Sequence, residues 1–275
     1  MSAQTIPAHT TRQAAAPLRI GAVRSLRHSL ALAGRGVTRF MKSPMQLTDV
    51  VLTPIISLLM FVYIFGGAIS GGDDDAYLRT VTPGIMVMTV FQASIGIGVS
   101  LNADASTGMF DRFRSMPIAR SGPLVGAVLA DFVRYAVCLG TLLVLALIMG
   151  YRIGTDPLST LAALALLIGF ALSFSWLSVY IGMLAKTPAS VQGLMTIVVL
   201  PLTFASNVFV PDKTMPGWLQ AWSDVNPVSL MADTVRGLLN GGAVAHPLLG
   251  SLAWMAGMVA VFFPLAMRAY RKSVG

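Results

Sequence analysis

The sequence predicts an all-α membrane protein with six transmembrane helices, preceded by a cytoplasmic amphipathic helix. Its mean hydropathy is +0.75 and only 11% of its 275 residues are charged, whereas soluble domains contain about 25%. All eleven acidic residues are aspartates, although glutamate is the better helix former. Most of the helix is therefore expected where charge is not tolerated, and the composition excludes a disordered or disulfide-rich protein.

Six apolar stretches have lengths close to the roughly 20 residues that a helix needs to cross a bilayer. They are residues 50–69, 81–101, 124–150, 158–184, 189–210 and 247–267. Backbone polar groups must be satisfied internally in hydrocarbon, and no two-residue alternation indicates barrel strands, so each stretch is predicted to be an α-helix. Only the third contains charges. These are Asp131 and Arg134, which share a helix face near its start.

The distribution of basic residues predicts that both termini are cytoplasmic. Fifteen of the nineteen Lys and Arg residues lie in the two terminal segments, at the start of span three, or in the connections after spans two and four. The side richer in these residues normally faces the cytoplasm. Residues 71–80 and 211–246 are accordingly expected outside.

The N-terminal segment divides into two parts. Residues 1–17 show no periodicity and are predicted to be disordered. Residues 18–45 are predicted to form an amphipathic helix at the membrane interface, with basic side chains opposite an apolar stripe. A helix is disfavoured at the residue before proline, so it should end at Ser43. The transmembrane domain then covers residues 46–275. The stripe comprises Val23, Leu26, Leu30, Ala33, Val37 and Phe40.

The sequence lacks the signatures of several chemistries. It has no Gly-Lys dipeptide and so no phosphate-binding loop of the G-x-x-x-x-G-K-[ST] type. Five of the six stretches contain no ionisable residue, which argues against a proton relay. The three histidines, His9, His28 and His246, show no metal-ligand spacing. We therefore expect a chain that is not an enzyme and that binds no cofactor, metal ion or nucleic acid itself.

A connection on the cytoplasmic side, between spans two and three, carries an unusual mixture of side chains. It alternates charges with two phenylalanines from Asp104 onward and is interrupted by Pro117. Apolar side chains among charges suit a docking surface, although a plain connector is an equal alternative from the residues alone.

This connection resembles the cytoplasmic segment of permease subunits of type 2 ABC exporters, in particular the daunorubicin-resistance family. A second match is residues 204–211, Phe-Ala-Ser-Asn-Val-Phe-Val-Pro, followed by 215–220, 225–227 and 233–237 in the family's order and spacing. The resemblance extends from about Phe40 to the end. It implies a second permease copy, either identical or related, and two copies of a separate ATP-binding subunit.

The resemblance also implies roles for particular residues. The ATPase would contact the amphipathic helix and the connection; Asp104 stands where the family often has glutamate. Residues 211–246 look like an outer re-entrant element, with an ordinary external loop as the alternative. The implied ATPase-coupling residues are Asp104, Gly108, Phe110, Asp111, Arg112, Phe113, Arg114 and Pro117.

The expected function is export of a hydrophobic or amphipathic drug or lipid-like compound across a bacterial plasma membrane, in contact with membrane lipid. A proton-coupled secondary transporter and a non-transporting scaffold or biogenesis protein are the alternatives. Polar side chains within spans are candidates for the substrate pathway, and interhelical hydrogen bonding is an equal explanation for them. The pathway candidates are Gln92, Ser94, Thr203, Phe204 and Asn207.

Overall fold

The computed structural model describes residues 33–34, 36–38, 40–66, 74–107, 122–210 and 214–274, and within these ranges it contains helices and no strand. This confirms the all-α prediction. The elements from residue 44 onward are α2 (Pro44–Met60), the π-helix η1 (Phe61–Phe65), α4 (Asp74–Ala93), α5 (Ile95–Ser106), α7 (Gly122–Ile148), α8 (Pro157–Leu184), α9 (Pro188–Phe204), α10 (Gly217–Ser223), α11 (Pro227–Asn240) and α12 (Ala245–Val274).

Five helical stretches of the described residues are long and apolar enough to cross a membrane. They are Pro44–Ile64, Tyr77–Ser106, Leu124–Ile148, Pro157–Leu184 and Ala245–Lys272. The fifth predicted span, 189–210, is instead a shorter apolar helix that ends at Phe204. The prediction that the helix continues to residue 210 was wrong, because residues 205–210 leave the helix and pack against α11.

Before α2, the described residues 33–34, 36–38 and 40–41 are helical. Ala33 and Phe40, two members of the predicted apolar stripe, are buried, and Gly36 lies against Ala130 of α7. Ser43 is extended and Pro44 opens α2, so the predicted break at this dipeptide is confirmed. Residues 1–32 lie outside the described residues, and the interfacial position of the helix stays a prediction.

The second predicted span, 81–101, is two helices joined at Ser94. The Ser94 hydroxyl donates a hydrogen bond of 2.6 Å to the carbonyl of Phe91. Such a local bond competes with the regular helical ladder and is common where helices bend. The span therefore has a defined break, which the apolar pattern did not predict.

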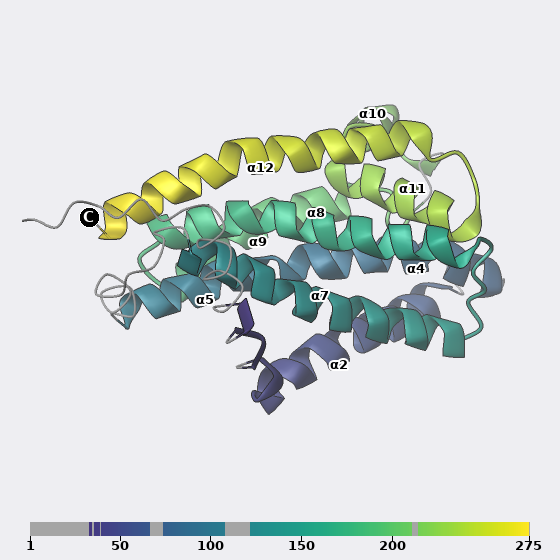
Figure 1. The fold of residues 1–275 in the computed structure, drawn as a ribbon. Helices are drawn as coiled ribbons and strands as arrows, with labels where there is room; N and C mark the ends of the chain where they lie inside the picture. The colour runs from purple at the N-terminus through teal and green to yellow at the C-terminus, as the bar shows by residue number, and fades with distance from the viewer. Residues whose placement is uncertain are drawn as a thin grey trace, which may run out of the picture.

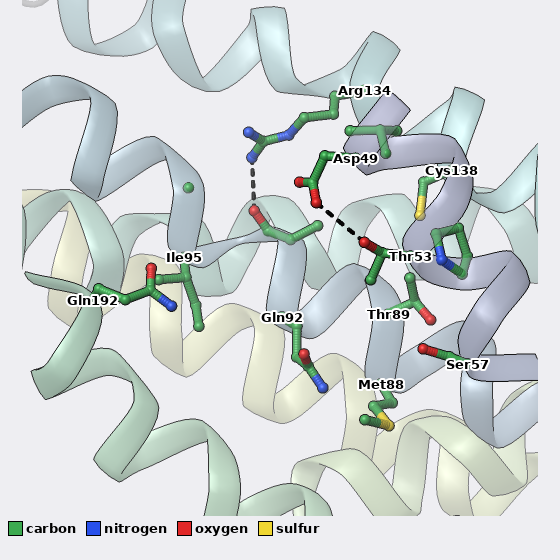
Figure 2. A pocket seen from close by; sticks show the side chains of 14 residues that line it. Asp49, Thr53, Ser57, Met88, Thr89, Gln92, Ile95, Arg134, Cys138 and Gln192 are labelled. Carbon is green, nitrogen blue, oxygen red and sulfur yellow. Dashed lines mark hydrogen bonds between the residues drawn. The ribbon is translucent and has the colours of Figure 1, made fainter. Parts of the chain in front are cut away.

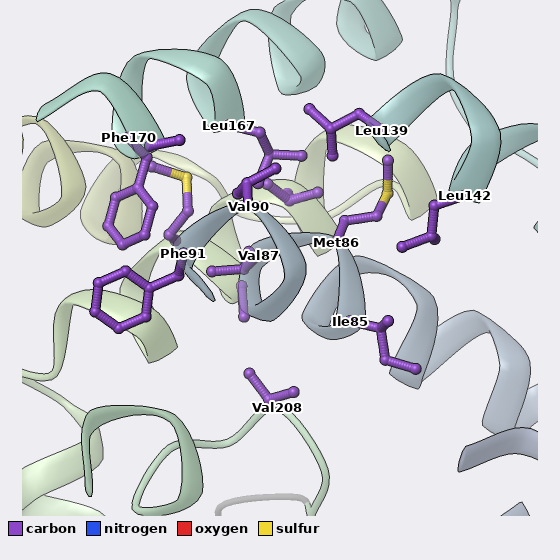
Figure 3. Close-up of a cluster of buried hydrophobic side chains, with 14 of the residues drawn as sticks. Ile85, Met86, Val87, Val90, Phe91, Leu139, Leu142, Leu167, Phe170 and Val208 are labelled. Atoms are coloured by element: carbon purple, nitrogen blue, oxygen red, sulfur yellow. The ribbon is translucent and has the colours of Figure 1, made fainter. Parts of the chain in front are cut away.

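Helix α8 lies at the centre of the bundle (Figure 1). Its N-terminus is capped by Asp156, whose carboxylate accepts hydrogen bonds from the Ser159 hydroxyl and backbone amide; the hydroxyl bond is the main cause of a lowered pKa of Asp156. Further along, Phe170 and Phe174 meet Phe91 of α4 with ring centroids 5.7 and 4.7 Å away. Figure 3 shows this core, with Val208 approaching it from the segment after α9. The core thus joins α4 to α8.

Helix α11 folds back against the bundle. Nearly all side chains from Pro227 to Val235 are buried, and the helix lies beside α4, α8 and α12. An ordinary external loop, one alternative from the sequence, does not describe a segment packed in this way.

The helix ends fall into two groups at opposite ends of the bundle (Figure 1). The C-terminal ends of α5, α8 and α12 lie together with the N-terminal ends of α7 and α9. The α7–α8 and α11–α12 connections lie at the other end. This alternation matches the order of spans in the predicted topology.

Candidate functional site

Backbone groups on both sides of Ser94 form hydrogen bonds with side chains of two other helices. The Arg134 guanidinium of α7 donates a hydrogen bond of 2.6 Å to the Ala93 carbonyl. The Ser178 hydroxyl of α8 donates to the Ile95 carbonyl at 2.8 Å and accepts from the Gly98 amide at 3.1 Å. Because unsatisfied backbone groups are costly in hydrocarbon, these contacts stabilise the broken conformation.

Arg134 lies near the midpoint of the 27-residue helix α7, whereas the sequence placed it near the start of its span. This expectation was wrong by residue count, since Arg134 is the eleventh residue of the predicted stretch 124–150 and the thirteenth of α7. Arg134 and Asp131 form an ion pair of 2.9 Å. Tyr135 extends the pair into a buried network, since its hydroxyl lies 3.4 Å from the Asp131 carboxylate and 2.9 Å from the Ser175 hydroxyl.

Beside this network is a cavity of about 350 Å³ between α2, α4, the start of α5, α7 and α9 (Figure 2). Gln92, one of the predicted pathway residues, lines it, together with Arg134. Apolar side chains such as Met88 and Ile95 complete the wall. The remaining polar lining residues are Asp49, Thr53, Ser57, Thr89 and Gln192.

A second polar cluster fastens the end of α9 to α11. The Asn207 side-chain amide donates to both carboxylate oxygens of Asp233 at 2.9 Å. Arg236 pairs with Asp233 at 2.8 Å and donates to the backbone carbonyls of Asn207 at 2.6 Å and Thr80 at 3.1 Å. Three separate segments, α4, α11 and residues 205–210, therefore meet at this arginine.

Asn226 satisfies the backbone where α9 ends. Its side-chain amide donates to the carbonyls of Leu202 and Ala205 at 2.9 and 3.0 Å. Its carbonyl oxygen accepts from the Val228 amide and so caps α11. One side chain thus ends one helix and starts another.

The pathway candidates predicted from the sequence do not form a single site. Gln92 lines the cavity, but Ser94 and Asn207 are buried in the hydrogen bonds just described. Thr203 is also buried, and its hydroxyl has no hydrogen-bond partner among the described residues. Phe204 is 61% exposed beside Phe209, with ring centroids 5.7 Å apart. Ser94 and Asn207 therefore take part in contacts within and between helices, and a role of either residue in the pathway stays a prediction.

Of the predicted ATPase-coupling residues, the structure describes Asp104, in the last turn of α5. Gly108, Phe110, Asp111, Arg112, Phe113, Arg114 and Pro117 lie outside the described residues. Close to Asp104, the Asn102 side chain donates to the carbonyls of Gly182 and Ala185 at 2.9 and 2.7 Å. The end of α5 that leads into the connection is therefore fixed to the end of α8.

Sequence reasoning missed several residues of these sites. Asp49 lay just outside the predicted first span, and Asp233 and Arg236 belonged to the family match in residues 211–246 without a predicted role in pairing. The spacing of three between Asp233 and Arg236 was an available signal for pairing on one helix face. No local pattern indicates that Asn226 reaches back to α9.

A bundle of apolar helices with a partly polar cavity fits the class of membrane-embedded transport subunits. The chain belongs to the ABC-2 type transporter family, whose sequence model matches residues 28–240. It is a multi-pass membrane protein and an ABC exporter permease subunit, and the ATPase is a separate partner.

Named relatives agree with this assignment. The chain is 42% identical over 238 residues to the daunorubicin resistance ABC transporter permease protein DrrB1 of Streptomyces coeruleorubidus, covering 86% of this chain and 84% of the relative. It is 23% identical over 246 residues to the probable doxorubicin resistance ABC transporter permease protein DrrC of Mycobacterium tuberculosis, covering 89% and 88%. The putative transport permease ycf38 of Porphyra purpurea is 26% identical over 197 residues, covering 66% and 65%.

Proposed function

We propose that this permease exports a hydrophobic or amphipathic drug or lipid-like compound from a bacterial cell, using ATP hydrolysed by its partner. The cavity between α2, α4, the start of α5, α7 and α9 carries the proposal, because it combines polar and apolar lining inside an apolar bundle. Ligand sites typically combine apolar walls with a few polar groups in this way. The names of the relatives DrrB1 and DrrC, which refer to daunorubicin and doxorubicin resistance, support this class of substrate.

The proposed topology has six spans with both termini in the cytoplasm. The uneven distribution of basic residues supports it, as does the grouping of helix ends at the two ends of the bundle (Figure 1). In this topology α9 is the fifth span, and α10 and α11 form a re-entrant outer element that Arg236 and Asn226 fasten to the rest.

The proposed assembly contains two permeases, identical or related, and two ATP-binding subunits. The connection that follows Asp104 is proposed to contact the ATPase, with Phe110 and Phe113 as apolar anchors. The bond between Asn102 and the end of α8 supports this role, because it gives α5 a firm attachment through which a rigid-body motion can pass.

The transport proposal is tested by reconstituting the permease with its ATPase in vesicles whose cytoplasmic face is outward. Uptake of daunorubicin should require ATP and should persist when the pH gradient is collapsed. Uptake driven by a pH gradient without nucleotide would instead indicate a proton-coupled transporter. Absence of uptake by an assembled complex that hydrolyses ATP would favour a scaffold.

The coupling proposal is tested by Phe110→Ala and Phe113→Ala. Each desolvated anchor is worth about 2 kcal/mol or more, whereas a rim charge contributes less. Both variants should therefore weaken ATPase pull-down and lower export without altering membrane insertion, and the control Arg112→Ala should act more mildly. Pull-down and export by the double phenylalanine variant at wild-type levels would refute the assignment.

A further inference from the structure

Asp49 is a carboxylate on a membrane helix with little to balance its charge. It lies in the second turn of α2 and is exposed. The Thr53 hydroxyl donates a hydrogen bond of 3.1 Å to it, and among the described residues no cation lies within ion-pair distance of it. A charged side chain within a membrane span normally has a partner or a function. A single hydroxyl supplies no opposite charge.

The charged side chains of the cavity lining are Asp49 and Arg134. Arg134 is already engaged by the Asp131 carboxylate at 2.9 Å and by the Ala93 carbonyl at 2.6 Å. This pair is neutral in sum. Asp49 is therefore the uncompensated charge of the lining, and Figure 2 shows its carboxylate directed towards the space beside Arg134 and Thr53.

The other lining groups suit a molecule that is both polar and apolar. Gln92 and Gln192 carry amides that both donate and accept hydrogen bonds, and they come from different helices, α4 and α9. Met88 and Ile95 supply an apolar wall. A volume of about 350 Å³ lies in the usual range of small-molecule sites.

We propose that Asp49 is the counter-ion for the amino group of a cationic amphipathic substrate bound in this cavity. This inference rests on the proposed export function and specifies its substrate class. The amine lies against the Asp49 carboxylate, and the apolar body lies along Met88 and Ile95. Selection between a cationic and a neutral molecule of the same shape follows from one charge-assisted contact.

The test compares two probes that differ at one nitrogen: daunorubicin, whose amino sugar is protonated at neutral pH, and its N-acetyl derivative, in which that nitrogen belongs to a neutral amide. Equilibrium binding to the full chain in lipid nanodiscs is measured by drug fluorescence, with protein-free nanodiscs subtracted. The variants are Asp49→Asn, the charge-conserving Asp49→Glu, and Asp224→Asn, which removes an exposed carboxylate between α10 and α11.

The wild type should bind daunorubicin about tenfold more tightly than the neutral N-acetyl derivative, an effect typical of one partly exposed charge contact. Asp49→Asn should abolish this preference and leave the affinity for the neutral probe within about twofold, while Asp49→Glu and Asp224→Asn should retain it. Equal binding of both probes by the wild type, or equal losses for both in Asp49→Asn, would overturn the inference.

The binding test does not depend on transport. A wild-type complex that shows no ATP-dependent uptake while its chain still prefers the cationic probe contradicts the export proposal and supports the role of Asp49. Uptake of both probes at equal half-saturating concentrations supports export and contradicts that role. Equal binding of both probes by the wild type overturns the inference without any variant, and Asp49→Glu provides a second variant if Asp49→Asn does not fold.

Discussion

Replacing Gly98 by alanine should destabilise the protein strongly, because helices α5 and α8 touch through their backbones there. A Cβ atom added at Gly98 would overlap the carbonyl and hydroxyl of Ser178. A Cβ atom at Gly182, on the facing helix, would come within 2.6 Å of the Gly98 carbonyl. Neither contact can be relieved by rotating a side chain, since the obstructing atoms include backbone, and so the helices must separate.

The cost follows from what separation breaks. Overpacking of this kind costs about 1–3 kcal/mol. The hydrogen bond from the Gly98 amide to Ser178 and the one from Ser178 to the Ile95 carbonyl would weaken as well, each worth about 1 kcal/mol. We therefore expect a loss of about 2–4 kcal/mol in the free energy of unfolding.

Gly140 is the matched control. It lies inside the apolar helix α7, and nothing comes within 4 Å of a Cβ atom built on it. Alanine is the better helix former by about 1 kcal/mol, so Gly140→Ala should be neutral or slightly stabilising. Both variants would be compared by reversible unfolding in mixed micelles.

Adding Ser178→Ala should not rescue Gly98→Ala, because the Ser178 carbonyl remains in place. A Gly98→Ala protein as stable as Gly140→Ala would refute the close-approach argument. Full rescue by Ser178→Ala would show that the hydroxyl alone, and not the backbone, sets the distance between the helices.

Three further outcomes are expected. Arg236→Ala should lower the free energy of unfolding by about 2–3 kcal/mol, and Arg236→Lys should restore little of it, because an ammonium group cannot reach the three acceptors from one planar fork; wild-type stability of the lysine variant, measured by unfolding, would contradict this. Gln92→Leu should change which compounds are exported at normal abundance, whereas Asn207→Leu should reduce abundance, and the reverse pattern in immunoblots and export profiles would count against the assigned roles. In intact cells of a cysteine-free variant, an impermeant thiol reagent should label a cysteine placed at Asp74 but not one placed at Ser106, and the opposite result would reverse the topology.

The sequence was sufficient for the helices whose signal is length and hydropathy. Helix α8 was predicted at 158–184 and occurs at Pro157–Leu184. An uninterrupted apolar run that does not alternate like a barrel strand can cross a bilayer only as an α-helix. The end of the N-terminal helix at Ser43 was predictable for a local reason too, the restriction that Pro44 imposes.

Features that depend on distant partners were not predictable. Ser94 in an apolar run gives no sign of a break, since the groups that stabilise it, Arg134 and Ser178, come from two other helices. The end of α9 was missed because residues 205–210 are on average as apolar as a span. Their non-helical course depends on tertiary contacts, since Asn226 bonds the carbonyls at the end of α9 and α11 packs against the segment. Local periodicity contains no information about these tertiary contacts.

The joint at Ser94 divides one membrane crossing into two mechanical parts. Helix α4 is tied to α11 through the Thr80 and Arg79 carbonyls, whereas α5 is tied to α8 through Asn102. The 12 residues of α5 make a lever about 18 Å long. A tilt of about 10° at the joint would shift the end of α5 by about 3 Å, and α8, which is bound to that end, would have to move with it. Because α8 also packs against α4 through Phe170 and Phe174, a shift of α5 would reach α4 through this core as well as through the joint.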